Sequence, residues 1–324
     1  MSSTADRLHV RERLTSAVAS IAITLLAVIA VGLLWVGPRF LSASNITIIG
    51  SFVAVPLLVG ACSGFALLAG VVDLSIGSLV GFSGAVFGLL VAAGWSPWPA
   101  GGVTLLLCLV CGTINALAIV VFGASPIAAT LGMLTALAGL NRVLLAPQGQ
   151  VAALVPGLLS FTSRPVLSLP LLFLLALAVI AIATVVVTRM RVGRHVQAVG
   201  GDDLAATRAG ISVPRVRFLA LVLSAFGAGL GGILYVGQLG SASNALGTGL
   251  EFQVYAALMI GGYSILRGGV GNPAGGAMGL LVVAGVANIL DVRAISPYYV
   301  NIIVGLLLLA AVLIDRLRGG DAYE

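Results

Sequence analysis

The sequence predicts an all-α polytopic membrane protein with about ten transmembrane helices and both termini in the cytoplasm. Hydrophobic residues make up 60% of the 324 positions and charged residues only 8%, whereas a soluble domain carries about 25% charged residues. The mean hydropathy is +1.19. The apolar residues also gather into runs of about 20, the length that crosses a bilayer. These observations predict one transmembrane domain over 1–324, with its membrane region at 15–315.

Ten apolar runs are separated by glycine, proline, asparagine and charge. The first follows three arginines and looks like a signal peptide, but it is longer than a signal core of about 7–15 residues. We therefore expect a retained span, with cleavage near Ser42–Ser44 as the alternative. The eighth run is short and flanked by glycine, which indicates a broken or re-entrant span. The runs are 15–37, 46–69, 74–93, 98–122, 126–146, 165–188, 215–236, 252–264, 272–290 and 297–315.

The arginines set the expected orientation. With the N-terminus inside, 12 of the 16 basic residues fall on the cytoplasmic side and 4 on the outer side, as the positive-inside rule requires. The net charge of +6 is therefore a topology signal, and no nucleic-acid partner is expected. The chain has no lysine, which excludes a phosphate-binding loop of the GxxxxGK[ST] type.

The longest polar interruption is the loop at 189–214, which continues to Arg217. It carries the signals of a short helix: Asp202 as a cap, helix-favouring residues from Leu204 to Ala209, and Gly210 at the end. A short helix on a basic loop can be docked by a soluble partner. The alternative is an ordinary cytoplasmic loop kept inside by its arginines.

Polar residues at membrane depth are the candidates for a substrate pathway. Asp73 stands between the second and third runs. It caps the third helix through its carboxylate, belongs to a pathway or gate, or does both. Uncharged polar groups suit a neutral hydroxylated solute, although hydrogen bonding between helices is the alternative for each. The pathway candidates are Asp73, Ser75, Asn115, Thr130 and Asn288.

Two further features bear on binding sites. Glu251 falls at an outer boundary in this topology, where it meets a partner outside the membrane or is simply solvated. The three cysteines, Cys62, Cys108 and Cys111, lie within apolar runs without a second pair or a histidine nearby. They are predicted to be small buried residues, and neither a metal nor a cofactor is expected.

Several motifs, in order from about residue 45 to 315, together resemble the inner-membrane subunits of ribose-type ATP-binding cassette (ABC) sugar importers. This family includes the ribose, xylose, arabinose and galactofuranose permeases. The chain departs from the family pattern at Val71, Gln253, Tyr263 and Arg267. The matching segments are Val72–Ser78, Asn115–Ala116, Pro126–Met133, Gly193–Gly201, Ala209–Ile211, Leu239–Ala242, Gly247–Glu251, Ile260–Gly262 and Gly268–Gly271.

The resemblance implies a permease subunit that imports a monosaccharide or related polyol across the bacterial inner membrane. Its implied partners are a cytoplasmic ATPase subunit with tandem nucleotide sites, a periplasmic or extracellular sugar-binding protein, and a second permease, identical or a sister chain, among membrane lipids. Glu251 becomes a candidate contact for the binding protein. The candidates for ATPase coupling are Gly200, Gly201, Asp202, Leu204, Arg208 and Gly210.

The alternative function is an ion-coupled secondary transporter of a small neutral solute. Such carriers need acids or histidines at membrane depth to bind the driving ion. Here Asp73 stands alone, and His9 and His195 are both expected on the cytoplasmic side. The sequence contains no cluster of nucleophile, base and metal ligands that would indicate an enzyme.

Overall fold

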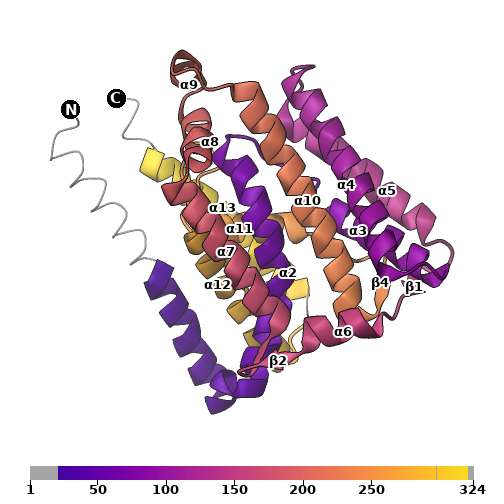
Figure 1. Cartoon of the computed structure of the whole chain (residues 1–324). Coiled ribbons are helices and arrows are strands. Elements are labelled where there is room, and N and C mark those ends of the chain that lie inside the picture. Colours follow the sequence, from indigo (N-terminus) through magenta and orange to yellow (C-terminus); the bar gives the residue numbers. More distant parts are fainter. Residues whose placement is uncertain (1–20, 297, 320–324) are drawn as a thin grey trace.

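A computed structural model describes residues 21–296 and 298–319 of the chain. These residues form a bundle of tilted helices with a few very short strands (Figure 1). Residues 1–20, including His9, the first three arginines and the expected start of the first span at residue 15, lie outside the described residues.

The helices follow the predicted apolar runs closely. Within the described residues, six helices are long and apolar enough to cross a membrane, and four shorter apolar helices complete the set. The described residues begin with the helix Ile21–Val36 and the 3-10 turn η1 (Pro38–Leu41). They continue with α2 (Ala43–Leu68), α3 (Ile76–Ala92), α4 (Pro97–Val120), α5 (Pro126–Leu144), α6 (Pro156–Ser163), α7 (Leu171–Arg189), α8 (Arg191–Gly201), α9 (Asp203–Arg208), α10 (Val213–Leu239), α11 (Leu250–Ile260), α12 (Pro273–Val292) and α13 (Tyr298–Gly319).

Local sequence explains where these helices begin. Proline occupies the first turn of α4, α5, α6, α10 and α12, where its missing N–H group costs nothing. The side chain of Ser42 accepts a hydrogen bond from the Asn45 amide at the start of α2, and Asn272 does the same for Ala274 in α12. Such caps satisfy amides that have no partner within the helix.

Helix α10 lies at the centre and packs against α2, α3 and α4. Its glycines permit close approach: a Cβ atom on Gly227 would lie 2.4 Å from Cβ of Cys62 in α2, and one on Gly232 would lie 2.3 Å from the Val80 carbonyl oxygen in α3. Gly231 also approaches Val59 of α2, so Gly227 and Gly231, four residues apart, both face α2. This is the packing mode of small residues in membrane helices.

The connections gather at two opposite ends of the bundle (Figure 1). Strands β1 (Gln150–Ala152) and β4 (Ser241–Ser243) pair at the same end as α6 and the hairpin of β2 (Pro165–Val166) with β3 (Leu169–Pro170). Helices α8 and α9 lie at the other end. The strand-bearing end therefore lies opposite the arginine-rich loop at 189–217, which the positive-inside rule assigns to the cytoplasm.

Helix α11 confirms that the eighth apolar run is broken. It has 11 residues, about 16 Å of helix, against a hydrocarbon core of about 30 Å. The preceding loop turns sharply because Gly247 and Gly249 both have φ of 77°, a left-handed conformation that suits glycine. The loop contacts α3: a Cβ on Gly247 would lie 2.2 Å from the Gly77 carbonyl oxygen. The chain thus re-enters the bundle before α11 begins.

Candidate functional site

The carboxylate of Asp73 is fully buried and fully hydrogen-bonded. It lies in the segment Ala69–Ser75 between α2 and α3, which we call the Asp73 segment, and only 1% of Asp73 is exposed. Its Oδ1 accepts from the Ser75 amide at 3.1 Å and from Ser75 Oγ at 2.6 Å. Its Oδ2 accepts from Ser224 Oγ of α10 at 2.7 Å. Both oxygens are therefore occupied in this conformation.

Two more helices join this cluster. The Tyr255 hydroxyl of α11 donates to the Asp73 carbonyl oxygen at 2.9 Å and lies 3.0 Å from the Asp73 amide, which donates to it. Asn115 of α4 donates through Nδ2 to Ser75 Oγ at 3.0 Å. The Asp73 cluster (Asp73, Ser75, Asn115, Ser224 and Tyr255) thus links the Asp73 segment to α4, α10 and α11. Three of its members are pathway candidates from the sequence.

Sequence reasoning missed Ser224 and Tyr255. Ser224 is a hydroxyl residue in an otherwise apolar, glycine-rich part of α10, and Tyr255 lies four residues after Glu251 on α11. Each gave only a weak signal, because single hydroxyl groups in membrane helices commonly bond to their own backbone. Ser224 is the eleventh residue after Val213, roughly 16 Å along α10, so the cluster lies inside the membrane region.

The other two pathway candidates bond elsewhere. Thr130 Oγ1 donates to the Pro126 carbonyl of its own helix at 2.8 Å. Asn288 of α12 exchanges two hydrogen bonds of 2.9 Å with Asn45 of α2. Asn45 also donates to the Phe40 carbonyl at 2.8 Å. Asn288 therefore joins two helices near η1, which is the structural alternative for a polar residue at this depth.

Glu251 lies inside the bundle, so its expected placement at the outer boundary is wrong. It is only 5% exposed, and its Oε2 has no hydrogen-bond partner. A Cβ on Gly77 of α3 would lie 1.8 Å from that oxygen. The cause is the loop through Gly247 and Gly249, which returns into the bundle before α11 starts. In this conformation Glu251 cannot meet a soluble binding protein.

A pocket of about 330 Å³ lies beside this re-entrant loop. Ligand pockets range from about 300 to 1,000 Å³, so this one has room for a small molecule. Its polar lining is uncharged, and no acid, arginine or histidine is among the lining residues. The hydrogen-bonding side chains come from the end of α10, the loop, α11 and α13; they are Tyr235, Ser243, Thr248, Gln253 and Asn301.

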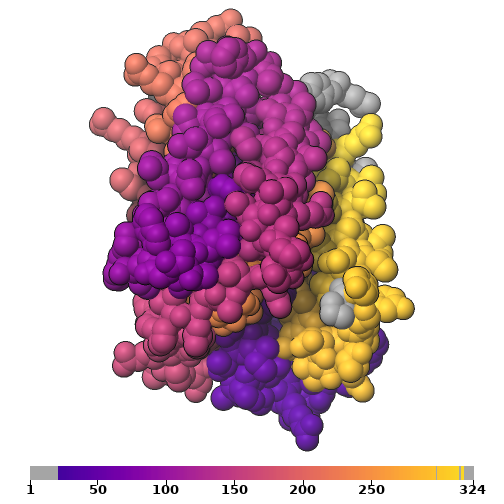
Figure 2. Space-filling view, turned by 90° about the vertical axis from the view of Figure 1, so that its right-hand side faces the viewer, coloured from indigo at the N-terminus to yellow at the C-terminus, as the bar shows by residue number. Residues whose placement is uncertain are grey.

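The surface seen in Figure 2 presents two groups of helices. Residues of α4 and α5, in purple and magenta, lie on one side, and α12 and α13, in yellow, lie on the other. Orange atoms from the region near residue 250 show between them. Large apolar side chains are exposed on α5 and α13, including Leu140 and Leu306. Such a surface fits a lipid environment or another apolar chain.

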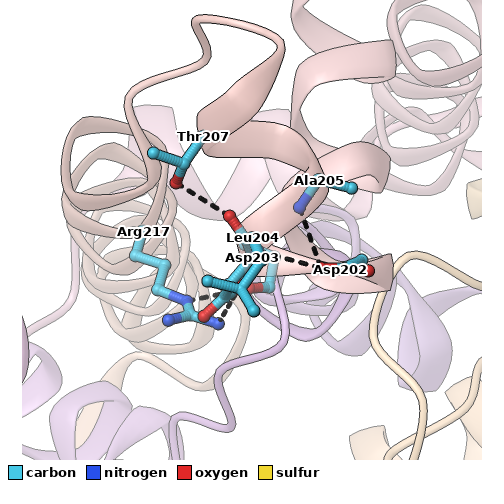
Figure 3. Close-up of polar contacts among 7 residues, drawn as sticks. Asp202, Asp203, Leu204, Ala205, Thr207 and Arg217 are labelled. Atoms are coloured by element: carbon cyan, nitrogen blue, oxygen red, sulfur yellow. Dashed lines mark hydrogen bonds and ion pairs between the residues drawn. The ribbon is translucent and has the colours of Figure 1, made fainter.

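The cytoplasmic loop forms the predicted short helix. Asp202 Oδ1 accepts from the amides of Leu204 and Ala205 at 2.8 and 2.9 Å, so Asp202 caps α9 as expected (Figure 3). Gly210 follows the helix with φ of 79°. Leu204 is 69% exposed, and α9 projects from the end of the bundle (Figure 1). An exposed leucine on a projecting helix is available to a partner.

The adjacent glycines Gly200 and Gly201 differ in how closely they are packed. Gly200 packs where three segments meet: a Cβ there would lie 1.8 Å from the Leu68 carbonyl oxygen and 2.3 Å from the Gly269 amide nitrogen. Gly269 itself donates to that carbonyl at 2.8 Å. A Cβ on Gly201, by contrast, would meet nothing within 4 Å. Only Gly200 is held by close backbone contact with the end of α2.

Comparison with known proteins shows which proteins the chain resembles. The D-allose transport system permease protein of Escherichia coli strain K12 is 32% identical over 281 residues, which cover 86% of this chain and 85% of that protein. The autoinducer 2 import system permease protein of Escherichia coli O9:H4 strain HS is 31% identical over 304 residues, 90% and 86% of the two chains. No solved structure matches the chain.

These similarities confirm the expected class of protein, the permease subunit of an ABC importer in the inner membrane, over the ion-coupled alternative. The role is that of a transport subunit without catalytic chemistry of its own. Residues 45–312 match the family described as branched-chain amino acid transport system / permease component, and the chain belongs to that family.

Proposed function

We propose that this permease imports a monosaccharide or a related polyol, driven by a separate cytoplasmic ATPase subunit with tandem nucleotide sites. The observation that carries the proposal is the uncharged polar pocket beside α11. Amide and hydroxyl groups, such as those of Gln253, Asn301 and Thr248, exchange hydrogen bonds with sugar hydroxyls. The relatives named for D-allose and autoinducer 2 support a cargo of this kind.

The partners follow from the two ends of the bundle. A sugar-binding protein delivers cargo at the end that holds β1, β4 and α6, and the ATPase docks at the end that holds α9. A second permease, identical or a sister chain, completes the membrane unit. The exposed apolar side chains of α5 and α13 support a lipid or permease neighbour on those helices.

We further propose that α9 couples ATP to the pathway. Closure of the ATPase pair moves the stretch from Gly200 to Ile211, in which Asp202, Leu204 and Arg208 form or cap α9. Gly200 touches the backbone of Leu68, one residue before the Asp73 segment. The movement therefore reaches the helices around the Asp73 cluster, and their two arrangements alternate outward and inward access.

Uptake into proteoliposomes tests the proposal. The permease is reconstituted with its cognate ATPase and binding protein, and labelled sugar is added on the binding-protein side. We expect uptake that requires hydrolysable ATP and persists when ionophores collapse proton and sodium gradients. Uptake by the permease alone that follows an imposed ion gradient would contradict the proposal and support the secondary transporter.

Substitution at Asp73 distinguishes between two roles for this residue, a helix cap and a gate in the transport pathway. Asp73→Asn keeps an acceptor for the Ser75 amide and an amide that can bond Ser224, so we expect normal assembly but reduced transport. Asp73→Leu leaves the buried Ser75 amide and Ser224 hydroxyl without their acceptor, at a cost of about 1–3 kcal/mol each. We therefore expect loss of the folded protein from the membrane, measured by size-exclusion chromatography in detergent. Full transport by Asp73→Asn, together with unstable Asp73→Leu, would make Asp73 only a cap.

A further inference from the structure

Arg217 lies near the start of α10 and contacts two other segments through separate nitrogen atoms. Its Nη2 donates to Asp203 Oδ1 of α9 at 2.8 Å, and its Nε donates to the Ala69 carbonyl oxygen at 3.2 Å. Figure 3 shows the guanidinium beside Asp203 at the base of α9. Ala69 is the C-cap that follows α2 and begins the Asp73 segment. One side chain thus joins α9, α10 and α2.

The same side of α10 holds the Asp73 segment at a second point. Arg217 and Ser224 are seven residues apart, which is two helical turns, so their side chains share a face. Arg217 bonds to Ala69 at one end of the segment, and Ser224 bonds to Asp73 four residues later. The chain between these two bonds begins with a turn at Ala69 and Gly70 and continues without regular structure to Asp73, beside about 10.5 Å of helix. The Asp73 segment lies along α10 and is tied to it at both points.

Arginine suits this position chemically. The carbonyl of Ala69 belongs to the C-terminal end of α2, where backbone oxygens lack helical partners and a positive charge is favoured. Asp203 stands in the first turn of α9, where a negative charge is favoured. A guanidinium presents donors in a rigid fork and serves both acceptors at once, whereas lysine is a point charge on a flexible stem.

Stability alone does not account for the contact. The Arg217 and Asp203 side chains are 26% and 48% exposed, and exposed ion pairs contribute little to folding. What the pair provides is a connection between the exposed helix α9 and the segment that carries the buried Asp73. A weak contact of this kind can also be broken and remade in a transport cycle.

We propose that Arg217 is a positioning residue that transmits the movement of α9 to the Asp73 segment. This inference rests on the proposed docking of the ATPase at α9. Movement of Asp203 with the ATPase pulls on Arg217, and Arg217 shifts the Ala69 end of the segment relative to α10. The hydrogen bond between Asp73 and Ser224 lies four residues further along the same segment.

The test measures how strongly the cargo-loaded binding protein stimulates ATP hydrolysis in the reconstituted complex, relative to the basal rate of each variant. We expect Arg217→Gln to lower this stimulation at least about fivefold, the lower limit of usual coupling between sites. Asp203→Ala should lower it as well. The double variant should lose no more than Arg217→Gln alone, because both changes break one link. Arg215→Gln is the matched control, since Arg215 is exposed on the same helix and should keep the stimulation.

Three outcomes would overturn the proposal. The first is stimulation in Arg217→Gln equal to that in Arg215→Gln. The second is a double variant whose loss is the product of the two single losses. The third is a misfolded Arg217→Gln beside an unaffected Asp203→Ala, because Arg217 would then only hold the fold. Binding of the ATPase to the Leu204→Asp variant distinguishes failure of the proposed docking at α9 from failure of the proposed role of Arg217. Normal binding by Leu204→Asp refutes docking at α9, whatever the Arg217 variants do.

Discussion

Gly200→Ala is expected to destabilise the permease by about 3 kcal/mol, the upper end of the usual cost of overpacking. The added Cβ would lie 1.8 Å from the Leu68 carbonyl oxygen and within 3 Å of the backbone of Gly268 and Gly269. Backbone atoms cannot rotate aside as the end of a flexible side chain does. The contact between α8, the end of α2 and the loop before α12 would therefore have to open.

Gly201→Ala is the matched control for this prediction. It makes the same chemical change at the next position, where a Cβ meets nothing within 4 Å. Thermal unfolding in detergent, followed by the loss of helical circular dichroism, measures both. We expect Tm to fall by at least about 5 °C in Gly200→Ala and to stay unchanged in Gly201→Ala. Equal Tm values in the two variants would refute the close contact.

Leu204→Asp is expected to weaken binding of the ATPase roughly 10- to 100-fold. Burying one leucine at an interface contributes about 1.5–3 kcal/mol, and the substitution also places a charge in the partner's groove. Helix α9 itself should stay folded, because the new carboxylate joins Asp202 and Asp203 at its N-terminal end, where negative charge is favoured. Loss of binding would therefore report on docking rather than on local unfolding.

Two controls sharpen this result. Leu204→Met keeps an apolar side chain of similar size and should bind the ATPase nearly as the original chain does. Leu167→Asp makes the same change at a leucine that is 91% exposed, in the hairpin at the opposite end of the bundle, and should not affect binding. Co-purification with the ATPase measures all three. Normal binding by Leu204→Asp would show that α9 is not the docking element.

Much of the fold follows from hydropathy and helix punctuation. Asp202 and Gly210 marked a helix of six residues within a polar loop, because cap and stop signals act over a few neighbouring residues. The glycine-flanked eighth run indicated a broken span for a similar reason: the apolar run at 252–264 is too short for a helix that crosses the hydrocarbon core. These are local properties, so the sequence alone was enough.

The site was only partly predictable, because it depends on which faces meet. Asp73, Ser75 and Asn115 stood out as polar groups in apolar surroundings, but nothing local linked Ser224 or Tyr255 to them. Glu251 was misplaced because two glycines with positive φ bring the chain back into the bundle, and glycine is compatible with several backbone paths. Asn288 forms hydrogen bonds with Asn45, 243 positions away, a contact that only the folded chain reveals.

Site-specific cross-linking tests most directly whether α9 receives the ATPase. A photo-activatable residue is placed at position 204 or, in a separate variant, at position 167, and each permease is reconstituted with its purified cognate ATPase and illuminated. The account predicts a cross-link to the ATPase from position 204 and none from position 167. A cross-link from position 167, or none from position 204 in a complex that still hydrolyses ATP in response to loaded binding protein, would contradict it.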